Sequence, residues 1–327
     1  MTAGDDIAAQ LGAIGFAKRP LISSRFLDES CERYRNGKSG VFSIWIVTPD
    51  SYSFSRCFED VAFSLQCAFR ELGFKVPVVT RPEGTTGTVI VLGPHLPSRI
   101  NQQSLPERMV LFNLEQVYLD SPWITPQYIE LAERHLLWDY SERNVAQWSA
   151  LGVHCAAVCG IGYVPELSRI SESSNRDIDV TFIGCNNDRR RAILVDLEKQ
   201  NINLHWLFDV WGQQRDEVIA RSKILLNFHL YEAKVFEVVR VSYLLANSCC
   251  VVSEIGSDVS AEEPLSAGIA FTDYSNLVAC CMELLVNSEE QSRLRSDGFR
   301  LIKERDQVRL LQIALGASGL SVSTGQV

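Results

Sequence analysis

The sequence lacks several patterns that would settle its class at once. Ten cysteines occur in 327 residues, yet no two have the two-residue spacing of common zinc and redox motifs. No apolar run approaches the ~20 residues needed to cross a bilayer. The N-terminal MTAGDDIAAQLGAIGF has neither the basic start nor the apolar core of a signal peptide. We therefore expect a cytoplasmic protein with reduced, buried thiols, and neither a disulfide framework nor a transmembrane segment.

An excess of positive charge is missing as well. The formal net charge is -9 at pH 7, so nonspecific nucleic-acid binding, which needs a basic face, is not expected. Hydrophobic residues make up 46% and charged residues 22% of the chain, a balance that supports real cores. An acidic chain can still bind phosphate through a few arginines and helix N-termini, so a nucleotide ligand stays open.

Strands and helices alternate in two halves of similar size. At roughly 100–200 residues per domain, the length predicts two domains. The alternation predicts α/β domains with parallel sheets, and two such domains imply a cleft between them where ligands bind. The segment GIGYVP, followed by polar residues, marks the boundary. We expect an N-terminal arm (1–38), a first domain (39–163), a linker (164–178), a second domain (179–310) and a flexible tail (311–327).

The stretch 223–254 forms the most informative unit of the second half. Apolar runs at 224–228 and 249–252 predict two buried strands, with a polar loop and a helix between them. Such a right-handed βαβ unit places its loop beyond the carboxyl ends of the strands, where open α/β sheets bind ligands. The polar residues of this loop are therefore candidates for chemistry.

A second candidate turn precedes this unit. Gly184 follows a predicted strand, and Arg189 and Arg190 fall on the first turn of the next helix. A helix N-terminus with arginines can hold phosphate, although arginines on a first turn can also be a solvated face. The single glycine does not match a dinucleotide-binding fingerprint.

Five residues of the central unit extend this set of candidate nucleotide-binding residues. Glu237 and Arg240 share a helix face, so they can form a structural salt bridge. Glu237 also falls in the predicted first turn, where its carboxylate can accept both hydroxyls of a ribose while Lys234 holds a diphosphate. His229 and Glu254 each follow a predicted strand, where a purely structural role is the alternative.

The first half offers candidate general bases at its strand ends. Asp50, His95 and Glu115 each follow an apolar strand, so each can point into the cleft and take a proton from an acceptor hydroxyl. Asp139 with Tyr140 is a fourth possibility. Loop capping is the alternative for each of these residues.

Several motifs together resemble a known family. DVTFIGCNNDRRRAIL, LFDVWGQQRDEVIARSKILLNFH and FEVVRVSYLLANSCCVVSE in the second half, with LFNLEQV, LLWDYSERN and GIGYVPEL in the first, are similar to GT-B glycosyltransferases. The likeness is to small group-1-like proteins of the spore-maturation CgeB type, over most of residues 40–305. It implies two facing Rossmann-like domains, a nucleotide-diphosphate sugar held mainly by the second, an acceptor on the first, and no catalytic metal.

One feature departs from this pattern. Retaining group-1 enzymes carry two glutamates eight positions apart, but Arg240 lies eight after Glu232, and Leu245 lies eight after Glu237. Neither the roles of that pair nor retention of configuration therefore transfers. We expect a metal-independent transferase that moves a sugar to an unknown acceptor hydroxyl. The alternatives are a sugar-nucleotide epimerase and a catalytically silent nucleotide-sugar-binding protein.

Overall fold

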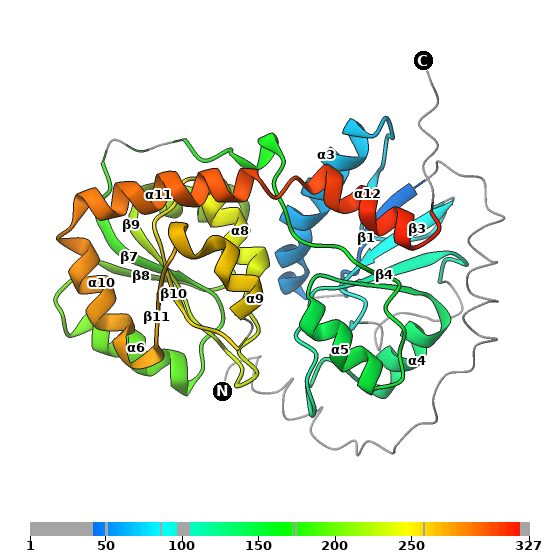
Figure 1. The fold of residues 1–327 in the computed structure, drawn as a ribbon, viewed down its shortest axis with the longest axis horizontal. Helices are drawn as coiled ribbons and strands as arrows, with labels where there is room; N and C mark the ends of the chain where they lie inside the picture. The colour runs from blue at the N-terminus through cyan, green and yellow to red at the C-terminus, as the bar shows by residue number, and fades with distance from the viewer. Residues whose placement is uncertain are drawn as a thin grey trace. The chain divides into compact units, whose positions relative to one another are not determined.

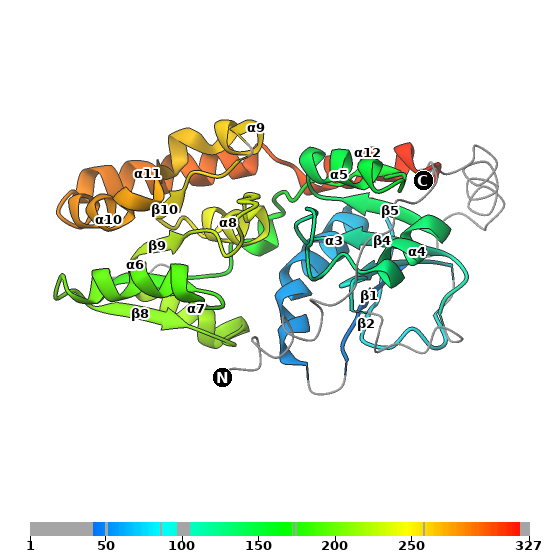
Figure 2. The ribbon, with the colours of Figure 1, turned by 90° about the horizontal axis from the view of Figure 1, so that it is seen from below.

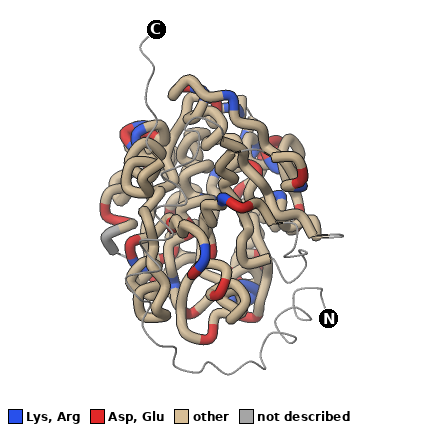
Figure 3. Tube along the Cα trace, turned by 90° about the vertical axis from the view of Figure 1, so that its right-hand side faces the viewer, with Lys and Arg blue, Asp and Glu red and all other residues tan. Residues whose placement is uncertain are grey.

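The computed structural model forms two compact units (Figure 1). One unit comprises the chain up to Gly160 together with the residues from Val308 onward, and the other comprises Ile161–Gln307. The described residues are 42–49, 52–85, 87–96, 105–171, 173, 175–257 and 259–320. The expected N-terminal arm and Asp50 lie outside them. Acidic and basic residues are interspersed along the trace (Figure 3).

The first unit is built on six parallel strands in the order β2-β1-β3-β4-β5-β6. The strands are β1 (Phe42–Ile46), β2 (Val78–Val79), β3 (Thr88–Leu92), β4 (Met109–Asn113), β5 (Leu136–Asp139) and β6 (Ala157–Val158). The helices are η1 (Ser53–Phe58, 3-10), α3 (Glu59–Glu71), α4 (Pro126–Arg134), α5 (Glu142–Ala150) and α12 (Gln307–Ala317).

The second unit is built on five parallel strands in the order β11-β10-β9-β7-β8. The strands are β7 (Ile178–Ile183), β8 (Leu204–Leu207), β9 (Ser222–Asn227), β10 (Val251–Glu254) and β11 (Ala270–Thr272). The α-helices are α6 (Asp188–Glu198), α7 (Gly212–Arg221), α8 (Val238–Ala246), α9 (Val259–Glu262), α10 (Leu277–Leu285) and α11 (Ser288–Lys303). The 3-10 helices are η4 (Pro165–Leu167), η5 (Glu263–Gly268) and η6 (Tyr274–Asn276).

Both sheets reverse their winding direction once. The chain passes from β1 outward to β2 and then returns past β1 to β3, and it passes from β7 outward to β8 and then returns past β7 to β9. Each reversal leaves a crevice at the carboxyl ends of two neighbouring strands, which is the usual ligand position in doubly wound sheets. The relevant pairs are β1 with β3 and β7 with β9.

Buried apolar side chains hold the layers of the second unit together. Val180, Phe182, Ile224 and Leu226 are buried on the sheet face covered by α6 and α10, while α7 packs on the same strands. Figures 1 and 2 show helices lying on both faces of each sheet. Strands covered on both faces read as continuous apolar runs, which is why the sequence locates them well.

The domain boundaries differ from the sequence prediction. The predicted flexible tail is wrong for residues 311–317, because they lie in α12 and bury Leu311, Ala314 and Leu315. The three buried residues have the i, i+3, i+4 spacing of one helix face, a pattern that the prediction of a flexible tail overlooked. The predicted linker belongs to the second unit, since Asn247 Oδ1 accepts the backbone N–H groups of Arg169 and Ile170 at 3.0 and 2.9 Å.

Close packing of two glycines generates a stability prediction. A Cβ added at Gly268 would lie 2.3 Å from Gly298 Cα on α11. We expect Gly268→Ala to lower the free energy of unfolding by about 1–3 kcal/mol through overpacking. Gly316→Ala is the control, because a Cβ there meets no atom within 4 Å and helix propensity favours alanine by about 1 kcal/mol. Urea unfolding followed by circular dichroism measures both. Equal effects of the two changes would contradict this packing.

Candidate functional site

The crevice between β7 and β9 gathers the candidate residues of the second unit. Gly184 ends β7, and a Cβ there would lie 3.2 Å from Arg240 Nη2 and 3.4 Å from Arg190 Nη1. Glycine is therefore needed for two guanidinium groups to approach this turn. Asn187 caps α6 by accepting the backbone N–H of Arg190 at 2.9 Å, which fixes the start of the helix that carries the arginines.

Arg190 is a buried cation tied to the backbone. Its side chain is 2% exposed, and it donates to the carbonyls of Cys185, at 2.8 Å, and Phe228. Its guanidinium also lies 5.0 Å from the ring centroid of Phe182. Burial, with the nearby charge of Arg240, lowers the pKa of Arg190 to about 9, so the group keeps its charge at neutral pH.

Glu237 lies at the centre of a polar cluster. One carboxylate oxygen is 3.0 Å from His229 Nδ1 and accepts from Asn227 Nδ2 at 3.2 Å. The other oxygen is 3.8 Å from Arg190 Nη2. Burial alone would raise the pKa of Glu237, but His229 and the charges of Arg240 and Arg190 lower it to about 2. Glu237 is therefore ionised throughout the physiological range.

Asn227 organises this cluster although the sequence analysis did not single it out. Its amide is fully buried; Oδ1 accepts from Arg240 Nη1 at 2.8 Å, while Nδ2 donates to Glu237 and to Ser253 Oγ. The amide thus keeps Arg240 and Glu237 apart and orients both. An uncharged polar residue that ends an apolar strand was the available signal.

Glu254 collects two further cations. Its carboxylate, fully buried at the end of β10, accepts from Arg189, from Lys234 Nζ at 3.1 Å and from the backbone N–H of His229 at 3.1 Å. Burial opposes ionisation, yet Arg189 and these other partners lower the pKa of Glu254. The Arg189 guanidinium also lies 4.0 Å from the ring centroid of Tyr274.

The structure therefore brings together all the candidates of the second unit. The members are Gly184, Arg189, Arg190, His229, Lys234, Glu237, Arg240 and Glu254. Glu237 is the N-cap residue of α8, so the helix starts just after it and not, as predicted, before it. His229 is fully buried, and its Nε2 has no hydrogen-bond partner among the described residues. These candidates include four cations and two carboxylates. A third carboxylate, the buried Glu262, lies close by and accepts the backbone N–H of Gly256 at 2.6 Å, so the cations still outnumber the carboxylates.

In the first unit His95 and Glu115 form a pair at the carboxyl ends of β3 and β4. His95 Nε2 lies 3.6 Å from Glu115 Oε1, and the His95 ring contacts Trp123 at a centroid distance of 5.2 Å. Burial lowers the pKa of His95 to about 3 and raises the pKa of Glu115 to about 7. The imidazole is therefore neutral at pH 7, and the carboxyl group titrates there.

Asp139 is structural and not a catalytic candidate. It is fully buried, and its two oxygens accept from Asn113 Nδ2 at 2.7 Å, Trp148 Nε1 at 2.9 Å, Asn144 Nδ2 at 3.0 Å and the Ser141 backbone N–H at 2.9 Å. Burial raises the pKa of Asp139 to about 7 in spite of these donors.

The same two asparagines position the loop after β4. Asn113 and Asn144 both donate to the backbone carbonyl of Glu115, at 2.8 and 2.9 Å. Asn144 Oδ1 also accepts the backbone N–H of Val117 at 3.0 Å. Asp139 thereby holds the backbone from which the Glu115 side chain projects.

The sequence contains an Asp-Xaa-Asp triplet, Asp177-Ile178-Asp179. This is the spacing with which metal-dependent transferases hold a metal ion, and the expectation of a metal-independent reaction overlooked it. It lies at the start of β7, opposite the crevice. Asp177 pairs with Arg221, and Asp179 lies 2.6 Å from Lys223 Nζ. Both carboxylates therefore serve as structural ion-pair partners.

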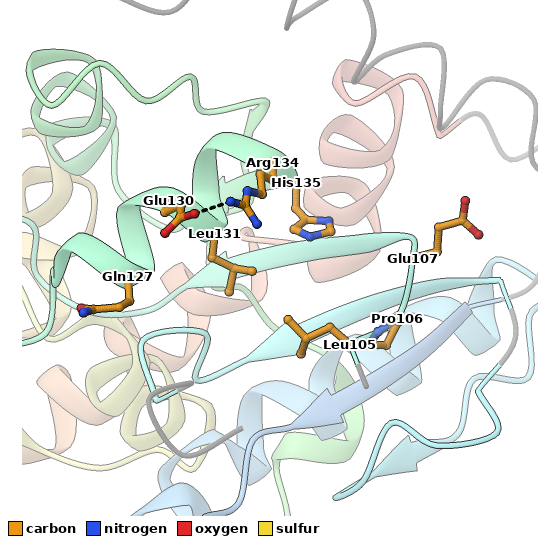
Figure 4. A pocket seen from close by; sticks show the side chains of 8 residues that line it. All are labelled: Leu105, Pro106, Glu107, Gln127, Glu130, Leu131, Arg134 and His135. Atoms are coloured by element: carbon orange, nitrogen blue, oxygen red, sulfur yellow. Dashed lines mark hydrogen bonds and ion pairs between the residues drawn. The ribbon is translucent and has the colours of Figure 1, made fainter. Parts of the chain in front are cut away.

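A separate hollow in the first unit lies at the edge of the sheet where the strands begin (Figure 4). Residues 105–107, which precede β4, and side chains of α4 and His135, which precedes β5, line it. These positions are at the amino ends of the strands, whereas His95 and Glu115 lie at the carboxyl ends. Glu130 and Arg134 pair at its rim. The hollow is therefore distinct from the paired His95 and Glu115.

Comparisons of sequence find distant relatives. No family model matches the chain. Two uncharacterized proteins of Acanthamoeba polyphaga mimivirus are similar: one is 26% identical over 191 residues, which are 54% of this chain and 59% of that protein. The other is 28% identical over 124 residues, 37% of this chain and 17% of that protein. The chain thus spans less than two thirds of either relative.

Comparisons of structure are more decisive. HepE from Anabaena, solved with UDP and glucose, superposes with a TM-score of 0.55 at 10% identity over 84% of this chain and 97% of its own. A TarM variant from S. aureus, solved with Fondaparinux, alpha-GlcNAc-glycerol and UDP, gives 0.52 at 10% identity over 71% and 55%. Both are GT-B glycosyltransferases. The chain has the GT-B fold. This confirms the expected α/β class with two Rossmann-like parallel sheets.

Among the helices of the described residues of this GT-B chain, none has the length and apolar character to span a bilayer.

The raised pKa of Glu115 generates a pH prediction. A carboxyl group with a raised folded pKa stabilises the fold below its unfolded pKa of 4.5, and this contribution is lost as pH rises through about 7. The full shift corresponds to about 3 kcal/mol, and the side chain is 23% exposed, which reduces the effect to about 1–2 kcal/mol. We expect Glu115→Gln to exceed the wild type in unfolding free energy by this amount at pH 8, and by much less at pH 5. A difference that does not change between the two pH values would contradict the assignment.

Proposed function

We propose that the chain transfers a sugar from a nucleotide-diphosphate donor to an acceptor hydroxyl. The observation that carries this proposal is the charge arrangement at the β7–β9 crevice, where four buried or half-buried cations outnumber the carboxylates of Glu237, Glu254 and the neighbouring Glu262. A diphosphate leaving group needs such preorganised positive charge, because negative charge develops on it in the transition state. Structural neighbours solved with UDP support the choice of ligand.

The roles of individual residues follow from their positions. We propose that Arg189, Arg190 and Lys234 neutralise the diphosphate and that the ionised Glu237 accepts the ribose hydroxyls. The buried Nε2 of His229 offers a further polar contact, since a buried polar atom without a partner is unfavourable. With these cations in place, we propose that transfer needs no metal ion, so activity should persist in EDTA.

On the acceptor side we propose that His95 with Glu115 takes the proton of the acceptor hydroxyl. Both groups lie at carboxyl ends of strands. Glu115, whose pKa is raised to about 7, is the member suited to accept the proton, and the neutral His95 with its pKa of about 3 is a weak base that would orient the carboxylate. Asp50 keeps its place as an alternative base from the sequence. A cytoplasmic location is also proposed, in keeping with the nine free cysteines of the described residues.

Product analysis separates this proposal from its two alternatives. The wild-type protein is incubated with UDP-sugars, GDP-sugars and dTDP-sugars, with and without candidate glycan, lipid-linked or small-molecule acceptors. An epimerase converts the donor without any acceptor, and a silent binding protein gives neither hydrolysis nor transfer. A glycosylated acceptor with a released nucleoside diphosphate supports the transferase.

Glu237 provides the sharpest test of the binding mode. We expect Glu237→Ala to weaken nucleotide-sugar binding by about two to four orders of magnitude, because two charge-assisted hydrogen bonds contribute roughly 1.5–3 kcal/mol each. Isothermal titration calorimetry measures the affinity, and circular dichroism checks the fold. Glu232→Ala is the matched control, since Glu232 is exposed on the same loop. Unchanged affinity in Glu237→Ala would sink the ribose assignment.

A further inference from the structure

We propose that the exposed aromatic side chains at the end of β8, Trp206 and Phe208, form the platform on which the base of the nucleotide stacks. This inference rests on the proposed function and assigns the part of the donor that the charged cluster leaves unassigned. It also fixes the direction in which the nucleotide lies along the sheet.

The two rings are unusually open for such large apolar groups. Trp206 is 45% and Phe208 44% exposed, with ring centroids 6.5 Å apart. Trp206 lies in β8 and Phe208 directly follows the strand, and the two rings are tilted by 45° to each other. Exposed aromatic pairs of this kind offer π-faces to planar ligands.

A direct bond connects this platform with the charged cluster. Trp206 Nε1 donates to the carbonyl of Gly184 at 2.9 Å. Gly184 is the turn against which Arg190 and Arg240 pack, and Arg240 is held by Asn227, the partner of Glu237. The indole is thus fixed beside the proposed ribose and phosphate contacts and not on a remote surface.

The order of chemical groups along the sheet edge matches that of a nucleoside diphosphate. Following the strand order β10-β9-β7-β8, the carboxyl ends carry first Arg189 and Lys234, which pair with Glu254. The ribose candidate Glu237 comes next, with Arg190 3.8 Å from it. The Gly184 turn and the aromatic rings follow. Three strand spacings amount to about 14 Å, a span that phosphates, ribose and base can cover in sequence. The transferred sugar then lies toward β10.

Three proteins test the platform: the wild type, Trp206→Leu and Trp206→Phe. The leucine removes the ring and the hydrogen bond to Gly184, whereas the phenylalanine removes the hydrogen bond and keeps an aromatic face. Binding of UDP, GDP, ADP, CDP and dTDP is measured by calorimetry, and inorganic pyrophosphate serves as the base-free probe. Circular dichroism verifies folding, and Phe208→Leu serves as a second variant.

We expect Trp206→Leu to weaken the preferred nucleoside diphosphate roughly 10- to 100-fold, the range known for base–aromatic stacking. Trp206→Phe should retain most of the affinity, and pyrophosphate binding should be the same in all three proteins. Nucleotide-induced quenching of the fluorescence from the six tryptophans should shrink in Trp206→Phe.

The outcomes distinguish the platform from the proposed function. A wild-type protein that binds none of the five nucleotides overturns the donor site and the platform together. Normal nucleotide affinity in both Trp206→Leu and Phe208→Leu overturns the platform alone. An equal loss of pyrophosphate and nucleotide binding in Trp206→Leu also overturns it, because the tryptophan would then act through the Gly184 turn.

Discussion

Pairing of buried charge is the constraint on which the second unit depends. Glu254 has no exposed surface, and a carboxylate in that position is tolerated only with charged or hydrogen-bonding partners. Its partners come from the helix after β7 and the loop after β9, so one carboxylate fastens three strand ends together. The backbone of Lys234 is held in the left-handed region at a φ of 49°, a costly conformation that this fastening helps to maintain. The excess of cations at the same strand ends is the feature on which the proposed binding of a diphosphate rests.

In the first unit a buried carboxylate, Asp139, is stabilised by neutral hydrogen-bond donors. Asp139 accepts four hydrogen bonds and pairs with no cation among the described residues. Two of its donors, Asn113 and Asn144, also donate to the backbone carbonyl of Glu115 and so position that loop. A network of this kind orients groups without placing a net charge beside them. Burial shifts the pKa values of His95 and Glu115 far from their ordinary ranges, whereas cationic partners keep Glu237 and Glu254 ionised.

Residue pattern alone predicts the sheets well, and it identifies charged residues that the structure brings together at the ends of β7, β9 and β10; it predicts the rest unevenly. The predicted buried strands at 224–228 and 249–252 overlap β9 and β10, because strands that are covered on both faces form unbroken apolar runs. His229, Glu237 and Glu254 were found because strand ends are recognisable and charged residues stand out there. Asn227 and Asn144 were missed because their importance comes from partners 13 and 27 residues away in the chain. The packing of α12 was missed because it depends on a surface formed by distant strands.

The return of α12 to the first unit has a consequence for how the chain can be divided. The polypeptide crosses between the units twice, once near Gly160 and once near Val308. Ser318 supplies the hydroxyl that accepts the indole N–H of the fully buried Trp138 at 2.6 Å. A gene fragment that ends at the first crossing therefore encodes an incomplete first unit, in which the indole N–H of Trp138 has lost the hydroxyl of Ser318 as its acceptor. A circular permutant, with the old termini joined and new ones at the second crossing, would instead make that unit continuous.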